Sequence, residues 1–252
     1  MTTTPRIGLM LYTIRDECAR DLEGVLRAVG GLGYDGVEFF DLHGHDAALV
    51  RSWLDESGLV AAGRHAGLDA LEADLPALAN EVGVLGTNRI ALSWIDPPES
   101  GDESRAAAER IAAIASRAPA LELEFGFHNH WGELRPFDGV STLDLLSQLP
   151  PEQLWFELDL GWAWWAEVDP VALLERFAGR SPLVHVKDLR SRDTREYCPV
   201  GDGAVGFEWV LPAALDAGVE WLIVEQDEVD GPPLEAVERS LRAVQRMTSV
   251  TA

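Results

Sequence analysis

The sequence predicts a single α/β domain, residues 1–252, folded as a closed (β/α)8 barrel. A short apolar run followed by an amphipathic stretch recurs eight times, and no linker or low-complexity segment interrupts the repeat. Eight strand–helix units in about 250 residues are typical of a parallel barrel. The alternative is an open, doubly wound sheet. The first strand-to-helix turn, residues 13–21, carries no glycine-rich phosphate loop, which disfavours that alternative.

Each predicted strand is a short apolar run, and the runs come in this order: 7–12, 36–40, 59–65, 88–94, 121–130, 154–160, 183–189 and 221–226. Each predicted helix carries apolar residues at helical spacing. The helices follow the strands in order: 21–29, 46–57, 71–82, 104–118, 142–149, 171–178, 209–217 and 234–247. Glycines mark the ends of the first two helices, at Gly30-Gly31 and at Gly58.

The composition limits the partners. The net charge is −23, and a field of this sign repels nucleic acids and anionic membrane surfaces, so we expect neither as a partner. No apolar run approaches the ~20 residues of a membrane span. The start of the chain, Met-Thr-Thr-Thr-Pro-Arg, lacks the apolar core of a signal peptide, so we expect a cytoplasmic protein. Cys18 and Cys198 fit neither a disulfide framework nor a metal motif.

A barrel of this kind collects its functional groups at the carboxyl ends of the strands. The predicted strand ends carry mostly polar or aromatic side chains: Tyr12, Glu38, His65, Trp94, His128, Asp159, His185 and Glu225. The interiors of the runs, such as 183–184 and 222–224, are apolar. This polarity predicts a site at one end of the strands, in a barrel or in an open sheet alike.

Four of these ends predict a metal site. In the stretch Phe125–His130, side chains alternate between faces, so His128 and His130 point the same way. Imidazole and carboxylate ligands suit a divalent ion such as Mn, Zn, Co or Mg. The expected ligands are His128, Asp159, His185 and Glu225. Taken singly, each has another interpretation, for example Asp159 as a helix cap or Glu225 in a salt bridge.

Further polar residues lie two positions from these ends: Glu157, Lys187 and Asp227. A lysine beside a metal can hold a substrate oxygen or stabilise an enediolate. The alternative for Lys187 is a salt bridge to Asp188, Asp227 or Glu157.

The expected substrate contacts share a place at the barrel mouth: Tyr12, Glu38, His65, Trp94, His130, Trp162 and Arg192. Tryptophan rings stack on sugar C–H surfaces, but the cluster at 162–165 equally fits a contact between subunits, which would make a homo-oligomer. The glycine-rich stretch 200–207 predicts either backbone N–H groups that bind an anion or a tight turn. Arg190, Arg192 and Arg195 precede it and can hold a carboxylate or phosphate.

Several motifs, in order along nearly the whole chain, resemble the xylose isomerase-like TIM barrels, in the branch described as sugar phosphate isomerases/epimerases. The matching segments are Leu11–Asp16, Gly33–Glu38, Phe127–His130, Leu158–Trp162, His185–Asp188, Val200–Gly203 and Val224–Asp227. The resemblance implies one divalent metal held by Glu, Asp, His and Glu. Asp159, His185 and Glu225 match three positions, and His128 stands where the first glutamate is expected, with Glu133 close enough in sequence to reach back instead.

The resemblance also implies the reaction: a metal-dependent isomerase or epimerase that acts on a ketose, keto-sugar or related polyol by proton transfer through an enediolate. Relatives use a pair of metal-bound glutamates, so Glu225 would act with His128 or Glu157, and Lys187 would assist. A small-molecule sugar or polyol is the expected partner. Two alternatives share the site: an inosose-type dehydratase (a lyase) and a non-catalytic sugar-binding barrel. The endonuclease branch is disfavoured by six histidines in all and by the net charge.

Overall fold

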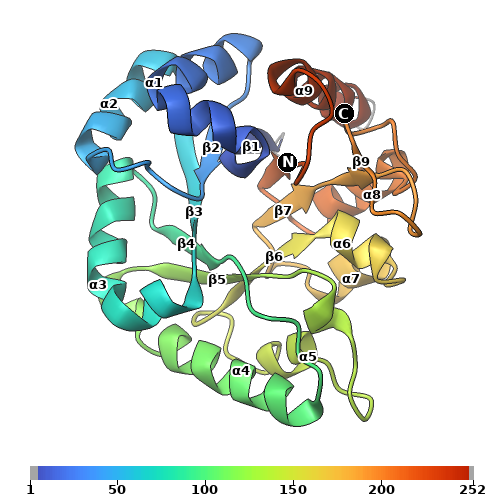
Figure 1. Cartoon of the computed structure of the whole chain (residues 1–252). Helices are drawn as coiled ribbons and strands as arrows, with labels where there is room; N and C mark the ends of the chain where they lie inside the picture. The colour runs from blue at the N-terminus through green and yellow to red at the C-terminus, as the bar shows by residue number, and fades with distance from the viewer. Residues whose placement is uncertain (1–4, 250–252) are drawn as a thin grey trace.

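Eight parallel strands close into a barrel in the computed structural model, which describes residues 5–249 (Figure 1). The barrel order is β1-β10-β7-β6-β5-β4-β3-β2. The strands are β1 (Arg6–Met10), β2 (Gly36–Phe39), β3 (Val60–Ala66), β4 (Arg89–Leu92), β5 (Glu124–His128), β6 (Trp155–Asp159), β7 (Leu183–Val186) and β10 (Trp221–Val224). The closed order confirms the predicted fold.

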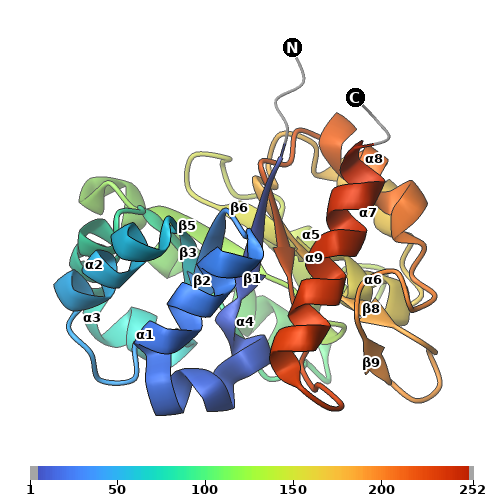
Figure 2. The same ribbon diagram turned by 90° about the horizontal axis from the view of Figure 1, so that it is seen from above.

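Helices surround the strands on the outside of the barrel (Figure 1). They are α1 (Arg15–Leu32), α2 (Ala47–Ser57), α3 (Leu68–Leu85), α4 (Gly101–Ala115), α5 (Thr142–Leu146), α6 (Leu160–Trp165), α7 (Pro170–Arg176), α8 (Phe207–Asp216) and α9 (Pro233–Ser249). Three 3-10 turns cover Leu11–Ile14, Ala118–Leu121 and Gly132–Leu134. Figure 2 shows α1 and α9 flanking β1, where the last helix closes the ring.

Two aspartates restart helices inside longer helical segments. Asp21 interrupts α1 with φ −158°, and its carboxylate accepts the N–H of Gly24. Asp74 interrupts α3 in the same way and caps Ala77, next to Pro76. Aspartate favours such positions because its side chain satisfies N–H groups that a new helix end leaves unpaired. Helix α1 begins at Arg15, six residues before the predicted start at Asp21.

Several elements differ from the sequence prediction. Five expected strands end two or three residues earlier: 7–12 at Met10, 88–94 at Leu92, 121–130 at His128, 183–189 at Val186 and 221–226 at Val224. After β7 the chain forms a short antiparallel hairpin of β8 (Asp188–Leu189) and β9 (Tyr197–Cys198). Helix α6 was not predicted, because the tryptophan-rich run at 160–165 lacks an amphipathic pattern. Its N-cap is Asp159, whose carboxylate accepts the N–H of Trp162 at 2.8 Å.

The barrel interior is filled by apolar side chains toward the amino ends of the strands and is polar at their carboxyl ends. A separate apolar cluster fills the interior below the site: Met10, Ala62, Ala91, Trp155, Leu183, Trp221 and Ile223. At the amino ends of the strands Arg89 pairs with Glu124 and Glu220, at 2.8 and 2.9 Å. Within residues 5–249 no helix is long and apolar enough to cross a membrane.

Candidate metal centre and active site

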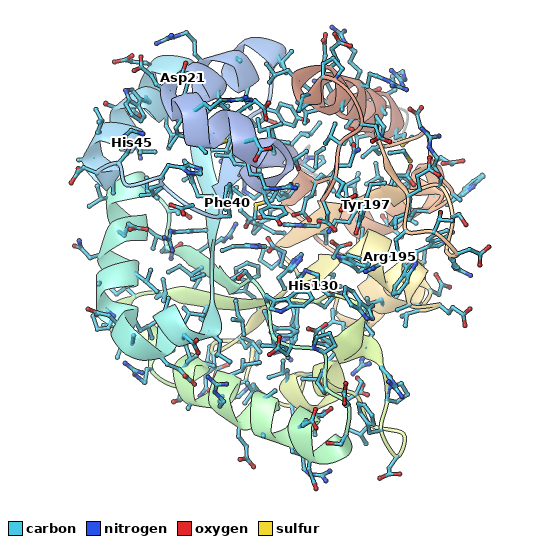
Figure 3. The ribbon with its side chains drawn as sticks, in the orientation of Figure 1. Asp21, Phe40, His45, His130, Arg195 and Tyr197 are labelled. Atoms are coloured by element: carbon cyan, nitrogen blue, oxygen red, sulfur yellow. The ribbon has the colours of Figure 1, made fainter. Side chains whose placement is uncertain are left out.

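A cavity of about 620 Å³ opens at the carboxyl ends of the barrel strands. Figure 3 shows Phe40 and the pair Tyr197 and Arg195 on opposite sides of this mouth, with His130 between them. The cavity is lined by most of the predicted substrate contacts: Tyr12, His65, Trp94, His130 and Trp162. His128 and Glu225 line it as well, whereas Glu38 is buried beneath it.

The predicted ligands His128, Asp159, His185 and Glu225 come together at the floor of the cavity. One ligand atom from each lies within 4.8 Å of the others, and all four side chains are buried. His128 Nδ1 is buried without a hydrogen-bond partner among residues 5–249, and Asp159 Oδ2 has only an ion pair with Lys187, at 3.0 Å. An unpartnered buried polar atom costs free energy, and a cation beside His128 Nδ1 would satisfy it. The donor set therefore fits a divalent ion.

His185 is held from both sides. Its Nδ1 lies 2.8 Å from Glu225 Oε2, and its Nε2 lies 2.8 Å from Glu38 Oε2. Histidine ligands commonly use their second nitrogen to bind a carboxylate that fixes the ring. Glu38 is suited to that role and would leave Nδ1 for a metal beside Glu225. Although burial opposes it, the carboxylates of Glu157 and Glu225 raise the pKa of His185 well above its ordinary value.

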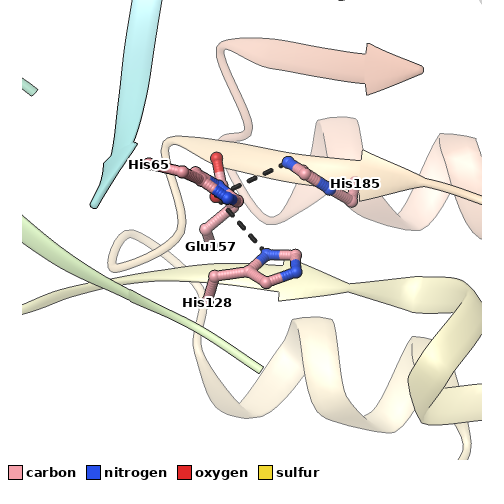
Figure 4. Close-up of side chains that lie close together, drawn as sticks. All are labelled: His65, His128, Glu157 and His185. Atoms are coloured by element: carbon pink, nitrogen blue, oxygen red, sulfur yellow. Dashed lines mark hydrogen bonds and ion pairs between the residues drawn. The ribbon is translucent and has the colours of Figure 1, made fainter. Parts of the chain in front are cut away.

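A second buried group lies beside the first: His65, His128, Glu157 and His185 (Figure 4). Glu157 Oε2 is central to it, 2.5 Å from His65 Nε2, 3.4 Å from His128 Nδ1 and 3.5 Å from His185 Nε2. Burial raises the pKa of Glu157. Burial lowers the pKa of His128 well below its ordinary value, so this ring is neutral and suits a ligand role.

Lys187 is the only lysine in the sequence, and its side chain is fully buried. Its Nζ lies 3.0 Å from Asp159 Oδ2, 2.8 Å from Glu225 Oε2 and 2.9 Å from Asp227 Oδ1. Of the three partners considered from sequence, only Asp227 is present. Although burial opposes it, these carboxylates raise the pKa of Lys187 well above its usual range.

Glu225 is ionised because of the ion pair that it forms with Lys187. Burial would raise the pKa of Glu225, but Lys187 and His185 hold it well below the usual range. Burial raises the pKa of Asp159 to about 6, with Lys187 opposing the shift. The cavity floor therefore combines one firmly ionised carboxylate with a permanent ammonium charge.

The loop after β5 is fixed by two side chains. Asn129 Oδ1 accepts the N–H of Asp159 at 3.2 Å, and Glu133 Oε2 accepts the N–H of His130 at 3.0 Å. Glu133 is buried there and belongs to neither potential ligand group among the described residues. The idea that Glu133 reaches back to a metal therefore has no support in the structure. Burial raises the pKa of Glu133 to about 7.

The glycine-rich loop after β9 binds a carboxylate of the same chain. The N–H groups of Gly201, Gly203 and Val205 donate to the carboxylate of Asp188, at 2.8, 3.1 and 3.3 Å. A Cβ at position 203 would lie 2.2 Å from Asp188 Oδ1, so glycine is required for this approach. These three N–H groups are therefore engaged by a side chain of the protein itself, and the loop is a tight turn.

Arg192, a predicted substrate contact, lies outside the lining of this cavity. Its Nε donates to the carbonyl of Trp164 at 2.9 Å, and Trp165 Nε1 donates to the carbonyl of Arg192 at 2.7 Å. These bonds dock the β8–β9 hairpin onto α6. Arg195 lines the cavity instead, with its guanidinium over the rings of Trp131 and Trp165. Trp162 is buried, and Trp164 and Trp165 are half-buried within the chain.

Other lining residues were not predicted, although Met10 and Ala66 end β1 and β3. They are Met10, Phe40, Arg64, Ala66, Gly67, Ala70, Leu78, Ser93, Trp131 and Tyr197. Tyr197 could have been anticipated only by recognising the hairpin in the long segment between β7 and α8.

Comparison with known proteins agrees with this architecture. The profile of the family described as Xylose isomerase-like TIM barrel matches residues 26–247. The chain is 28% identical over 268 residues to the rhizopine catabolism protein MocC of Rhizobium meliloti, covering 90% of this chain and 82% of that protein. It is 25% identical over 162 residues to an inosose dehydratase of Lacticaseibacillus casei, covering 55% of this chain and 53% of the dehydratase. The chain thus spans only about half of that relative.

Solved structures share the fold. A sugar phosphate isomerase/epimerase from Parabacteroides distasonis has a TM-score of 0.82 at 20% identity, covering 98% of this chain and 95% of that one. The probable 3-DHS dehydratase AsbF from Bacillus anthracis has a TM-score of 0.75 at 14% identity, covering 95% and 98%. The structural neighbours thus include both isomerase/epimerases and dehydratases. Since the family profile spans most of the sequence, the chain belongs to the xylose isomerase-like TIM barrel family.

Proposed function

We propose that this protein is a divalent-metal-dependent isomerase or epimerase of a ketose, keto-sugar or related polyol. The observation that carries the proposal is the buried cluster of His128, Asp159, His185 and Glu225 at the floor of the cavity. The ammonium group of Lys187 beside Glu225 keeps that carboxylate ionised, as a base at neutral pH must be. The family and its isomerase/epimerase neighbours support the same class of reaction.

His128, Asp159, His185 and Glu225 would hold the ion, with Glu38 orienting His185. A divalent ion there would polarise a carbonyl and acidify the neighbouring C–H of the substrate. Glu225 lines the cavity and is the group that removes this proton. Lys187 lies 2.8 Å from Glu225 but is fully buried outside the cavity lining, so it acts through Glu225, by keeping that carboxylate ionised.

Relatives use two metal-bound glutamates, and this chain carries His128 where the first of them is expected. A second proton-transfer group is therefore needed on another wall of the cavity. His65 fits this role. It comes from β3, lines the cavity, and is backed by Glu157 at 2.5 Å. Glu157 itself is fully buried outside the cavity lining, so it acts on the substrate only through His65. In this scheme His65 gives a different proton to the other carbon or the other face. That proton comes from the pair of His65 and Glu157, whose pKa is raised by burial, and the proton taken by Glu225 passes to solvent.

The test is a screen of keto-sugars, inososes and ketohexoses with the full chain in D₂O, followed by NMR. We expect deuterium to enter one substrate carbon without loss of water, in a reaction that needs added Mn²⁺, Co²⁺ or Zn²⁺. Glu225→Gln should abolish this exchange while the circular dichroism spectrum is unchanged. Absence of exchange in every substrate, with no rise in melting temperature on adding these metals, would leave the non-catalytic sugar-binding barrel.

An inosose-type dehydratase is the second candidate. It is favoured by His128 at the position where relatives carry a glutamate, because an elimination needs only one carbon base and an acid for the leaving hydroxyl. The match to inosose dehydratases supports the same alternative. In the same screen this reaction would appear as loss of water and formation of an unsaturated or diketo product.

A further inference from the structure

The cavity is chemically divided. The lining groups that can bind metal or hydroxyls include His65 on β3, His128 and His130 at the end of β5, and Glu225 and Asp227 after β10. The lining that follows β1, β2 and β4, together with the β3–α3 connection and α3, is mostly carbon. We call its six residues the apolar wall: Tyr12, Phe40, Gly67, Ala70, Leu78 and Trp94. The one charged lining residue beside the apolar wall, Arg64, is paired with Glu81 at 2.7 Å.

The rings of the apolar wall are held in place. Tyr12 packs edge-on against Phe40, with 5.4 Å between ring centroids, and Trp94 packs against His130 at 4.5 Å. Tyr12 and Trp94 nevertheless remain 37% and 40% exposed. Fixed aromatic rings that stay exposed inside a cavity are characteristic of a ligand surface, because they lose no side-chain freedom when a ligand covers them.

The β3–α3 part of the apolar wall has room. A Cβ at Gly67 would meet nothing within 4 Å, and the backbone there has φ −72° and ψ 154°, which any residue can adopt. Ala70 follows on α3 with only a methyl group. The space beside Gly67 and Ala70 therefore results from small side chains, and larger ones can fill it without backbone strain.

We propose that the apolar wall binds an apolar or aromatic substituent on the sugar, so that the substrates are keto-sugars carrying an alkyl or aryl group, such as glycosides. Hydroxyl groups placed against Phe40, Gly67, Ala70 and Leu78 would lose hydrogen bonds to water and meet no polar side-chain atom of these four residues. The polar side-chain atoms of the wall are Tyr12 Oη and Trp94 Nε1. A cavity of about 620 Å³ is also in the range that accepts a drug-sized ligand, which a lone sugar ring does not fill. The inference rests on the proposed function for the placement of the sugar at the metal centre.

The experiment compares phenyl and methyl D-glucopyranosides, in both anomers, by isothermal titration of the full chain. We expect the better phenyl glucoside to bind at least about tenfold more tightly than its methyl counterpart, because a ring is removed from water. In Gly67→Leu and in Ala70→Leu the ratio of the two Kd values should fall towards one. The control is Gly83→Leu on the exposed face of α3, where a Cβ also meets nothing within 4 Å and the ratio should be kept.

Equal affinities for the two glucosides, no phenyl glucoside binding at millimolar concentration, or an unchanged ratio in Gly67→Leu and Ala70→Leu would each overturn the inference. The readout is binding without turnover, so it separates the two proposals. A phenyl preference without any proton exchange in the keto-sugar screen would contradict the proposed function alone. Proton exchange without a phenyl preference would contradict only the proposal that the apolar wall binds a substituent.

Discussion

Glu157 Oε2 lies 2.5 Å from Nε2 of His65, although the two residues come from strands β6 and β3. No hydrogen bond among the described residues engages the other ring nitrogen of His65, so Nδ1 is left for the substrate. A buried carboxylate behind a histidine fixes its tautomer and the direction of its ring. Glu38 does the same for His185. In the proposed function the two glutamates therefore have different roles: Glu157 supports proton transfer by His65, and Glu38 supports metal binding by His185.

Glu157→Gln should therefore lower turnover and spare the metal. We expect kcat to fall about 10²- to 10⁴-fold, the usual contribution of an acid–base group. Metal content measured by elemental analysis should stay at the wild-type level. The matched variant is Glu38→Gln, which should weaken metal affinity about 10- to 100-fold through His185. Loss of metal in Glu157→Gln would instead identify Glu157 as a ligand.

Lys187 offers a second prediction, because nineteen of the twenty basic residues are arginine and only the buried one is lysine. A compact ammonium fits among three carboxylates at 2.8–3.0 Å, whereas the flat guanidinium fork does not. Lys187→Met leaves Asp159 and Glu225 buried without their partner, so metal-free protein should lose about 3–5 kcal/mol in the free energy of unfolding.

Urea unfolding with and without MnCl₂ checks this prediction. The stabilisation by Mn²⁺ should be larger in Lys187→Met than in the wild type, because the ion replaces the missing positive charge. Lys187→Arg should also be destabilised, although it keeps the positive charge. Wild-type stability in Lys187→Arg would contradict the steric argument.

The fold was predictable because a (β/α)8 barrel repeats one local pattern. The side chains at the strand ends were predictable for the same reason, and His128, Asp159, His185 and Glu225 do meet. Their partners were not predictable. The contact between His65 and Glu157 depends on the register around the barrel, and no local pattern in the sequence encodes that register. Arg192 shows the same limit, since the turn of the β8–β9 hairpin brings Arg195 to the cavity in its place.

The Asp188 carboxylate yields a third prediction. It accepts the N–H groups of Leu189, Gly201, Gly203 and Val205, and so holds the β8–β9 hairpin and the following loop together. Asp188→Asn removes the negative charge and places the side-chain NH₂ group of asparagine against backbone N–H groups, which are also donors. We expect a loss of about 2–4 kcal/mol in unfolding free energy. Limited proteolysis should show new cleavage within 199–206.

The control for this variant is Asp193→Asn, at the exposed tip of the same hairpin. It should keep the wild-type melting temperature and proteolysis pattern. Equal behaviour of Asp188→Asn and Asp193→Asn would show that the four N–H contacts contribute little.

Glu133 yields a prediction about pH. Burial raises the pKa of Glu133 from 4.5 to about 7, so the folded state holds a proton that the unfolded state releases. The associated stability is complete below pH 4.5 and is lost as the pH rises through 7. At about 1.4 kcal/mol per pKa unit, the loss is about 3 kcal/mol.

The amide introduced by Glu133→Gln cannot ionise, and its oxygen can still accept the N–H of His130. The variant should therefore match the wild type near pH 4.5 and exceed its unfolding free energy by about 3 kcal/mol at about pH 8. Urea titrations of both proteins at the two pH values measure the difference, and a difference that is constant with pH would mean that Glu133 is already ionised in the folded protein.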